Sequence, residues 1–343
     1  MKLKINYNDF VSTYPKFYKA ALFYPEFLKL KRKKLSFSRI KDVLSSKVPL
    51  HTLYSWRNKR IPLPFKEFCK IKKEFNKSDL ENLAIIVGHT LGDGGITNKK
   101  FLRYSNKEEF LIKEFQNAVE SVFSIKPMNK YQERSGIIRI VYPRLISRVL
   151  LCLFGEFSLG KENKKITRQI DAMPIWWKAK LLQAFYNDDG SVPESGYYRG
   201  VTFKQKDKNI TLWVQKTLKE LGINSKLTPD GNKWQLRIMN YFDLVKFRDK
   251  VNFSKGYRKQ IHLDKIIKKI KYPHWKTKNQ IIELLKKKPR TRKELAYLLN
   301  LESGTVYGHL HGWKRKKGKS QKGLIDLKIV KMRKVGRINL YYI

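Results

Sequence analysis

The chain has 343 residues, of which 41% are hydrophobic and 13% aromatic, so it is long enough for two or three domains and too apolar for a disordered protein. Its 75 Lys and Arg residues against 29 Asp and Glu give a net charge of +46, which opposes folding unless a polyanion offsets it. No apolar run reaches about 18 residues, which excludes a membrane span, and the N-terminal segment lacks the apolar core of a signal peptide. We therefore expect a cytoplasmic protein, associated with the nucleoid through its charge, whose partner is nucleic acid.

The first region, residues 1–80, predicts two short helices joined by a tight turn between residues 38 and 60. This is the spacing of a helix-turn-helix, although two core helices of an ordinary bundle would look the same. The second helix is basic and aromatic, which favours DNA binding. Leu53 is expected to face inward, and the residues expected to contact DNA are Tyr54, Trp56, Arg57 and Arg60.

The middle region, residues 81–275, repeats internally. Asp93 and Asp189 each follow an apolar helix and precede a glycine, and the order helix-strand-helix-strand-helix occurs twice. We interpret this as an α+β fold of two pseudo-symmetric repeats, residues 81–170 and 171–275. Alternating polar residues on the strands suit base readout, with Arg103 and Ser105 in one repeat and Lys204 and Gln205 in the other.

The helices before the two acids are apolar nearly all round, which is typical of buried helices. Gly88 and Gly92 are four residues apart on one helical face, and Ala184 matches Gly88 in the second repeat, so we expect the two helices to pack closely as a seam. Gly94 and Gly190 are expected to close the helices in the left-handed conformation. Both acids would then lie side by side at helix C-termini.

A carboxylate at a helix C-terminus is destabilised by up to about 1 kcal/mol, and a second carboxylate adds repulsion. A divalent cation would neutralise such a site, and oxygen ligands suit Mg²⁺ or Mn²⁺. The predicted ligands are Asp93, Asp189, Gly92 and Asp188. Hard cations held by carboxylates in a basic protein indicate phosphodiester hydrolysis.

The last region, residues 276–343, predicts three helices and then a hairpin whose strands, 324–330 and 338–343, flank a basic tip. Thr291 and Glu294 have the spacing of a capping box. This order is that of a winged helix. The residues expected to contact DNA are Thr305, Tyr307, His309 and Lys314.

IVGHTLGDG (86–94) and LQAFYNDDG (182–190) resemble the paired motifs of LAGLIDADG (DOD-type) homing endonucleases in the single-chain, two-repeat form. The small third residue, the final Asp and the terminal Gly match in both motifs. At the sixth position, where the family has an acid, this chain has Leu91 and Asn187. The resemblance covers about 195 residues.

The resemblance implies a saddle of two β-sheets over the DNA major groove, with catalytic Asp93 and Asp189 at the scissile phosphates and cleavage of both strands. It also implies a catalytic Lys or Arg from a basic loop late in each repeat. The candidates are Lys161, Lys164 and Lys165 in the first repeat and Lys255, Arg258 and Lys259 in the second. We favour Lys164 and Arg258.

Two alternatives to a sequence-specific, metal-dependent double-strand DNA endonuclease stay open. Some bacterial regulators resemble this family without its acids, so a non-catalytic DNA-binding regulator is the first. An RNA-splicing cofactor on the same fold is the second. In each case we expect a monomer, because one chain supplies both repeats.

Overall fold

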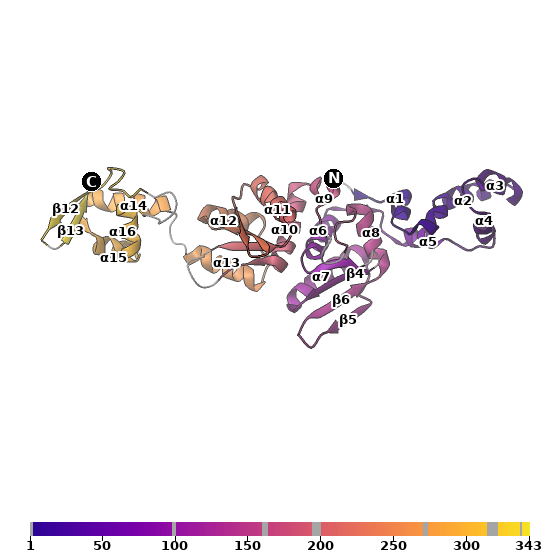
Figure 1. Cartoon of the computed structure of the whole chain (residues 1–343), viewed down its shortest axis with the longest axis horizontal. Helices are drawn as coiled ribbons and strands as arrows, with labels where there is room; N and C mark the ends of the chain where they lie inside the picture. Colours follow the sequence, from indigo (N-terminus) through magenta and orange to yellow (C-terminus); the bar gives the residue numbers. More distant parts are fainter. Residues whose placement is uncertain are drawn as a thin grey trace. The chain divides into compact units, whose positions relative to one another are not determined.

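The computed structural model describes residues 3–97, 101–159, 164–193, 200–269, 274–313, 322–336 and 338–343 (Figure 1). The chain divides into two compact units, Met1–Lys265 and Ile266–Ile343, and each is described by itself. None of the helices in the described residues is long and apolar enough to cross a membrane.

The N-terminal part of the first unit is mainly helical, and Phe37–Leu44 and Leu50–Arg57 are the two short helices that the sequence predicts. Leu53 is buried as expected, but Trp56 is only 4% exposed and packs among Tyr24 and Phe27, so the prediction that it faces outward is wrong. Burying the large apolar Trp56 ring in this small helical core is more favourable than leaving it in water. The elements are β1 Leu3–Lys4, α1 Tyr7–Ser12, the 3-10 helix η1 Lys16–Phe23, α2 Tyr24–Arg32, α3 Phe37–Leu44, α4 Leu50–Arg57, α5 Leu63–Lys70 and β2 Glu74–Phe75.

Two αββαββα arrangements follow, each with a four-stranded antiparallel sheet. The strand orders are β3-β4-β6-β5 and β7-β8-β10-β9, so the second sheet repeats the first. The first repeat has α6 Lys77–Leu91, β3 Gly94–Thr97, β4 Phe101–Asn106, α7 Glu109–Phe123, β5 Asn129–Gln132, β6 Ile138–Tyr142 and α8 Arg144–Phe154. After α9 Arg168–Asp171, the second has α10 Ile175–Asp189, β7 Gly190–Ser191, β8 Val201–Gln205, α11 Lys208–Glu220, β9 Lys226–Asp230, β10 Lys233–Ile238 and α12 Tyr241–Lys250.

The α+β fold is confirmed, but the expected order missed one strand of each hairpin. Strand β5 is exposed at all four residues and therefore carries no alternating pattern. Strand β7 has only two residues, Gly190 and Ser191. Hydrophobic patterning cannot detect edge strands of this kind, because their pairing comes from the backbone.

Helices α6 and α10 pack against each other as the seam between the repeats. A Cβ added at Gly88 would lie 2.5 Å from the Leu181 carbonyl oxygen and 2.8 Å from Ala184 Cβ. The close approach predicted from the small residues is therefore present, and it brings the C-terminal ends of both helices together.

The predicted left-handed closure at Gly94 and Gly190 is wrong. Neither glycine has a positive φ, and Gly190 is extended, with φ −83° and ψ 158°. Both residues start strands that fold back over the preceding helix. A Cβ at Gly94 would lie 2.8 Å from Thr90 Cα, and one at Gly190 would lie 2.9 Å from Tyr186 Cδ1. Glycine is needed at these two positions because a Cβ atom would clash with the preceding helix, and not because the backbone is left-handed.

The N-terminal part is tied to the first repeat through Arg148 of α8, which is only 6% exposed. Its Nη1 donates to the Thr13 carbonyl oxygen at 2.6 Å, and its guanidinium lies 3.7 Å from the centre of the Tyr14 ring. The hydrogen bond and the cation–π contact compensate for burying the charge.

The second unit has the three predicted helices and a sheet of order β11-β13-β12. The capping box of Thr291 and Glu294 is confirmed. The predicted strand over 324–330 is wrong, because Leu324 and Val330 pack into the core of this unit and the strand starts at the next residue. Helix α13 Arg258–Lys269 spans the division between the units. The remaining elements are α14 His274–Lys287, β11 Arg290–Thr291, α15 Arg292–Leu299, α16 Ser303–His311, β12 Lys331–Val335 and β13 Ile338–Tyr342.

Candidate functional site

The two acids of the repeated motif lie at the paired ends of the seam helices. Asp189 is the last residue of α10, and Asp93 follows the end of α6 by two residues. Burial, and then the charge of neighbouring Asp188, raise the pKa of Asp93 to about 6. The same causes in the same order, with Asp93 added, raise the pKa of Asp189 to about 7. Burial and the neighbouring negative charges therefore both oppose ionisation of the two carboxyl groups.

Each carboxylate accepts a hydrogen bond from an amide at the end of a strand in its own repeat. Asn106 Nδ2 donates to Asp93 Oδ2 at 2.8 Å, and Gln205 Nε2 donates to Asp189 Oδ2 at 2.6 Å. Gln205, predicted to read a base, is thus engaged with the carboxylate instead. Strand alternation turns it to the face opposite to Lys204, toward the seam helices.

A lysine from the basic segment late in each repeat reaches the end of its own seam helix; Lys259 is the second residue of α13. Lys164 Nζ donates to the Gly92 carbonyl oxygen, and Lys259 Nζ donates to those of Asn187 and Gly190, both at 2.6 Å. Burial lowers the pKa of Lys259, and the charge of Asp188 opposes that shift. The lysines satisfy carbonyl groups that a helix end leaves free.

Arg258, favoured from the sequence as the catalytic cation of the second repeat, lies elsewhere. Its guanidinium pairs with the Glu108 carboxylate at 3.0 Å on an exposed surface. Lys259, its neighbour, occupies the position that matches Lys164. The two residues begin helix α13, where consecutive side chains point in directions about 100° apart, and the sequence did not show which of them faces the seam.

Asp188, predicted as a metal ligand, turns inward, and its side chain is 0% exposed. One carboxylate oxygen accepts from the Tyr104 hydroxyl at 2.7 Å, the other accepts from the Asp93 N–H at 3.2 Å, and both lie 3.1 Å from His89 Nδ1. These bonds engage both oxygens within the protein.

A buried polar network continues from Asp188 across the seam. His89 Nε2 lies 3.1 Å from Glu114 Oε2, which also accepts from Asn187 Nδ2 at 3.0 Å. Burial alone would lower the pKa of His89, but the charge and hydrogen bond of Asp188, together with Glu114, raise it to about 10. A cationic imidazole between two carboxylates makes the burial of this network tolerable.

The residues at the seam fit a hard divalent cation, with a limited ligand set. Asp93 and Asp189 offer carboxylate oxygens whose crowded charge a cation would relieve, and the Gly92 carbonyl lies next to Asp93. Within the described residues, no three His, Cys, Asp or Glu side chains converge as a complete metal site. Mg²⁺ is often held by one or two carboxylates, with water and substrate phosphate oxygens completing the shell.

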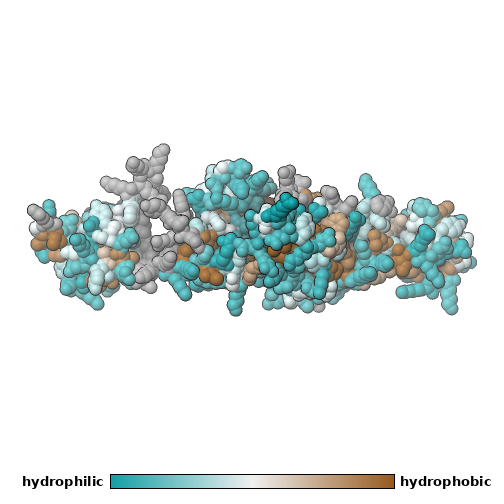
Figure 2. Space-filling model, turned by 90° about the horizontal axis from the view of Figure 1, so that it is seen from below, coloured by the Kyte–Doolittle hydropathy of each residue, from teal (hydrophilic) through white to brown (hydrophobic). Residues whose placement is uncertain are grey.

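The outer faces of the two sheets carry polar side chains, as predicted for Arg103, Ser105 and Lys204. Arg103 is exposed, and Ser105 Oγ accepts from Arg139 Nε at 3.2 Å. Lys204 is exposed and pairs with Asp230 at 2.7 Å. Hydrophilic residues predominate on the face of the molecule in Figure 2, with hydrophobic residues in separate patches.

The helical regions expose some of the predicted DNA-binding residues and bury others. Tyr54 is 47% exposed, and Arg57 and Arg60 are exposed. In α16, Tyr307 is exposed and Thr305 is half-buried. His309 is only 6% exposed, so the prediction that it contacts DNA is wrong: it lies on the core side of α16 next to Leu310. Lys314 and Lys161 lie outside the described residues.

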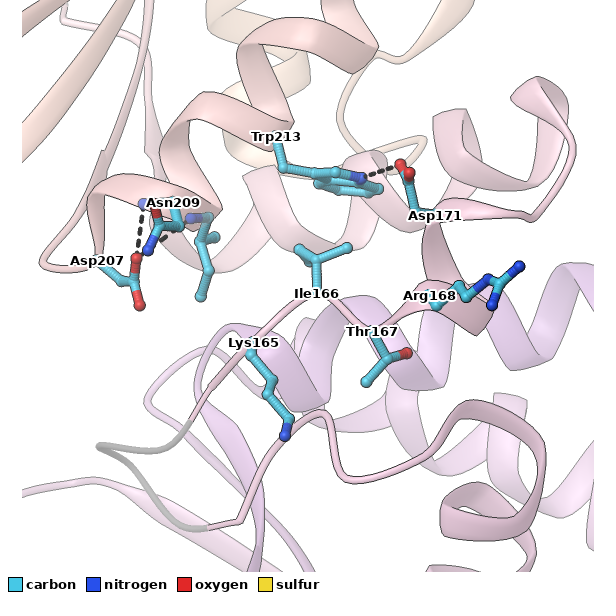
Figure 3. Close-up of a pocket in the computed structure, with 9 residues that line it drawn as sticks. Lys165, Ile166, Thr167, Arg168, Asp171, Asp207, Asn209 and Trp213 are labelled. Carbon is cyan, nitrogen blue, oxygen red and sulfur yellow. Dashed lines mark hydrogen bonds between the residues drawn. The ribbon is translucent and has the colours of Figure 1, made fainter.

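A cavity of about 500 Å³ lies between the segment after Lys164 and α11 (Figure 3). Its two acids are bonded within the chain, since Asp171 accepts from Trp213 Nε1 at 2.9 Å and Asp207 caps α11. Neither Asp93 nor Asp189 lines it, so it belongs to a different part of the molecule from the paired carboxylates.

Comparison with known families gives the class of the fold. Residues 176–252 match the family described as a LAGLIDADG-like domain. The match spans α10 to α12, including Asp189, and the first repeat has the same strand order. The second repeat thus belongs to the LAGLIDADG-like domain family, and the first repeat shares its topology.

Solved structures resemble the chain at low sequence identity. Full-length DUF199/WhiA from Thermatoga maritima is 15% identical with a TM-score of 0.41, over 68% of this chain and 90% of that chain. The homing endonuclease I-DmoI, in complex with DNA and Mn, is 16% identical with a TM-score of 0.41, over 52% of this chain and 99% of that chain. No curated protein matches the sequence.

Proposed function

We propose that the protein is a divalent-metal-dependent DNA endonuclease whose reacting groups lie at the seam between the repeats. The observation that carries the proposal is the pairing of Asp93 and Asp189, each with a raised pKa, at the ends of two helices in close contact. Two such acids cost stability in the free protein. A cation bound between protein and phosphate would recover that cost.

Asp93 and Asp189 would hold Mg²⁺ or Mn²⁺, which when bound supplies Lewis acidity and an activated water for phosphodiester hydrolysis. Asn106 and Gln205 fix the orientation of the two carboxylates through their amide hydrogen bonds. Lys164 and Lys259 place one positive charge near each motif, where it can stabilise charge that develops on the phosphate.

The substrate of the proposed reaction is double-stranded DNA. The net charge of +46 supports a large phosphate-neutralising surface. The outward-facing Arg103 and Lys204 are suited to base edges, and Tyr54 and Arg57 of the helix-turn-helix would extend the contact. If its three helices and basic hairpin act as a winged helix, the second unit would add a further DNA contact.

A non-catalytic DNA-binding regulator is the second candidate, and one observation favours it. Lys164 and Lys259 already satisfy the carbonyl groups at the seam with their own ammonium groups. Because these carbonyl oxygens already accept hydrogen bonds from lysines, the seam can fold without a bound cation. A protein that only binds DNA would need no metal there.

The experiment that separates the candidates starts from a randomised DNA library. Sequences retained by the full chain without metal are recovered, then incubated with the protein and Mg²⁺, and new ends are sequenced. The endonuclease proposal predicts defined ends on both strands with the unmodified protein. The double variant Asp93→Asn, Asp189→Asn should select the same sequences and leave them intact.

If both proteins select the same sequences and leave the DNA intact, the endonuclease proposal is rejected and the regulator proposal is supported. Asp249→Asn, which changes an exposed acid paired with Arg248, is the matched control and should cut as the unmodified protein does.

A further inference from the structure

The two seam helices end differently. Helix α10 continues through Asp189, so the N–H of Asp189 lies within the helix. Helix α6 ends at Leu91, and Gly92 leaves the helical conformation with a ψ of −108°. Asp93 therefore lies beyond the ladder of helical hydrogen bonds, and its N–H needs another acceptor.

The side chain of Asp188 supplies that acceptor from the opposite repeat. Its Oδ2 accepts the Asp93 N–H at 3.2 Å, while the Tyr104 hydroxyl and His89 Nδ1 fix the same carboxylate. Gly92 makes room for it, since a Cβ at Gly92 would lie 2.7 Å from Asp188 Cβ. The carboxylate is thus fitted against the turn that presents Asp93.

Among the described residues, no side chain of the first motif accepts a hydrogen bond from the Asp189 N–H. The residue that precedes Asp93 in the first motif is Gly92, which has no side chain to reach across the seam. The position of His89 is taken in the second motif by Phe185, which packs against Phe203. The bond across the seam is therefore made in one direction only.

We propose that Asp188 is a positioning residue of the second repeat that holds Asp93 of the first, and that it makes the two halves of the site unequal. Cleavage of one strand then depends on a bond across the seam, and cleavage of the other does not. This inference about strand cleavage rests on the proposed endonuclease function, whereas the positioning of Asp93 does not.

Two substitutions distinguish positioning from general packing. Asp188→Ala removes the acceptor. Asp188→Asn keeps one oxygen for the Asp93 N–H. Its amide group can donate to the Tyr104 hydroxyl oxygen and to Nδ1 of a neutral His89, so it should rescue the geometry. Asp207→Ala, which removes the N-cap of α11, is a control that lowers stability without removing a hydrogen bond to Asp93 or Asp188.

The first readout is hydrogen–deuterium exchange of the free full chain, followed in peptides that cover Gly92 to Thr97. Asp188→Ala should speed exchange of the Asp93 amide at least tenfold, while Asp188→Asn and Asp207→Ala leave it within about threefold of the unmodified protein. Unchanged exchange in Asp188→Ala would overturn the positioning of Asp93.

The second readout is the rate of nicking of each strand of a selected duplex, labelled separately, with Mg²⁺. Asp188→Ala should change the ratio of the two nicking rates at least tenfold, and Asp188→Asn should restore it. Equal slowing of both strands by Asp188→Ala would overturn the inequality. If the unmodified protein cuts neither strand, the endonuclease proposal and the strand inequality both fail, and exchange alone decides whether Asp188 holds Asp93.

Discussion

Substitution of Gly88 by Ala tests the packing that brings the two carboxylates together. The added Cβ would lie 2.5 Å from the Leu181 carbonyl oxygen, and ordinary contact begins at 3.4 Å, so the helices would have to part by about 0.9 Å. Overpacking of this kind costs about 1–3 kcal/mol, and the better helix propensity of Ala returns about 0.5–1 kcal/mol. The difference between these ranges is about 0–2.5 kcal/mol. Because the contact is with a backbone oxygen that cannot turn aside, we expect a net loss of unfolding free energy of about 1–2 kcal/mol.

The assay is thermal unfolding of the full chain followed by circular dichroism, with an expected fall in Tm of about 2–8 °C for the unit that contains the repeats. Gly304→Ala in α16 is the matched control, because nothing lies within 4 Å of its added Cβ. That control should be neutral or stabilising. A Gly88→Ala protein as stable as the unmodified chain would refute the close packing of α6 and α10.

Trp56→Ala should lower the unfolding free energy by about 3–5 kcal/mol, because it leaves a cavity at a buried site. Tyr54→Ala should change it by less than about 0.5 kcal/mol and weaken DNA binding. Denaturant titration measures the stability, and fluorescence anisotropy measures the DNA binding. The pKa of Asp189 is about 7 in the folded chain, above the ordinary value of 3.8, so the folded chain binds this proton more tightly than the unfolded chain does. The unfolding free energy measured in EDTA should therefore fall as the pH rises from about 4 to 7. Asp189→Asn should flatten that dependence, and parallel curves for the two proteins would contradict the pKa shift. Lys259→Ala should slow DNA cleavage by about 10- to 100-fold, and Arg258→Ala should slow it less than about threefold, as measured by single-turnover rates. The reverse order would make Arg258 the cation that stabilises the phosphate charge.

The sequence predicted the features of the fold that depend on buried side chains. Small residues at Gly88 and Ala184 predicted the close seam, and the repeated acid-glycine pairs placed Asp93 and Asp189 at its end. Apolar periodicity detected the long helices of both repeats, because their buried faces leave a clear pattern. It missed β5, which is exposed at every residue, and β7, which has only two residues.

Side-chain partners at the site were harder to predict, because they depend on register and on contacts between distant segments. Lys259 and Arg258 are neighbours of the same charge at the start of α13, and the orientation of that helix decides which one reaches the motif. Asn106 ends a strand with nothing in its local sequence to connect it with Asp93. Asp188 looked like a ligand because it precedes Asp189, yet its partners come from the other repeat.

The measurement that tests the central claim most directly is single-turnover cleavage of a selected duplex across a range of Mg²⁺ concentrations. The unmodified protein should cut both strands with a rate that rises and then saturates with Mg²⁺. The Asp93→Asn, Asp189→Asn protein should bind the duplex with a Kd within about threefold of the unmodified value and cut at least 1,000-fold more slowly, a loss of about 4 kcal/mol in transition-state stabilisation. Cleavage by the double variant at the unmodified rate, or cleavage that does not depend on Mg²⁺, would contradict the assignment of the seam carboxylates as the metal site.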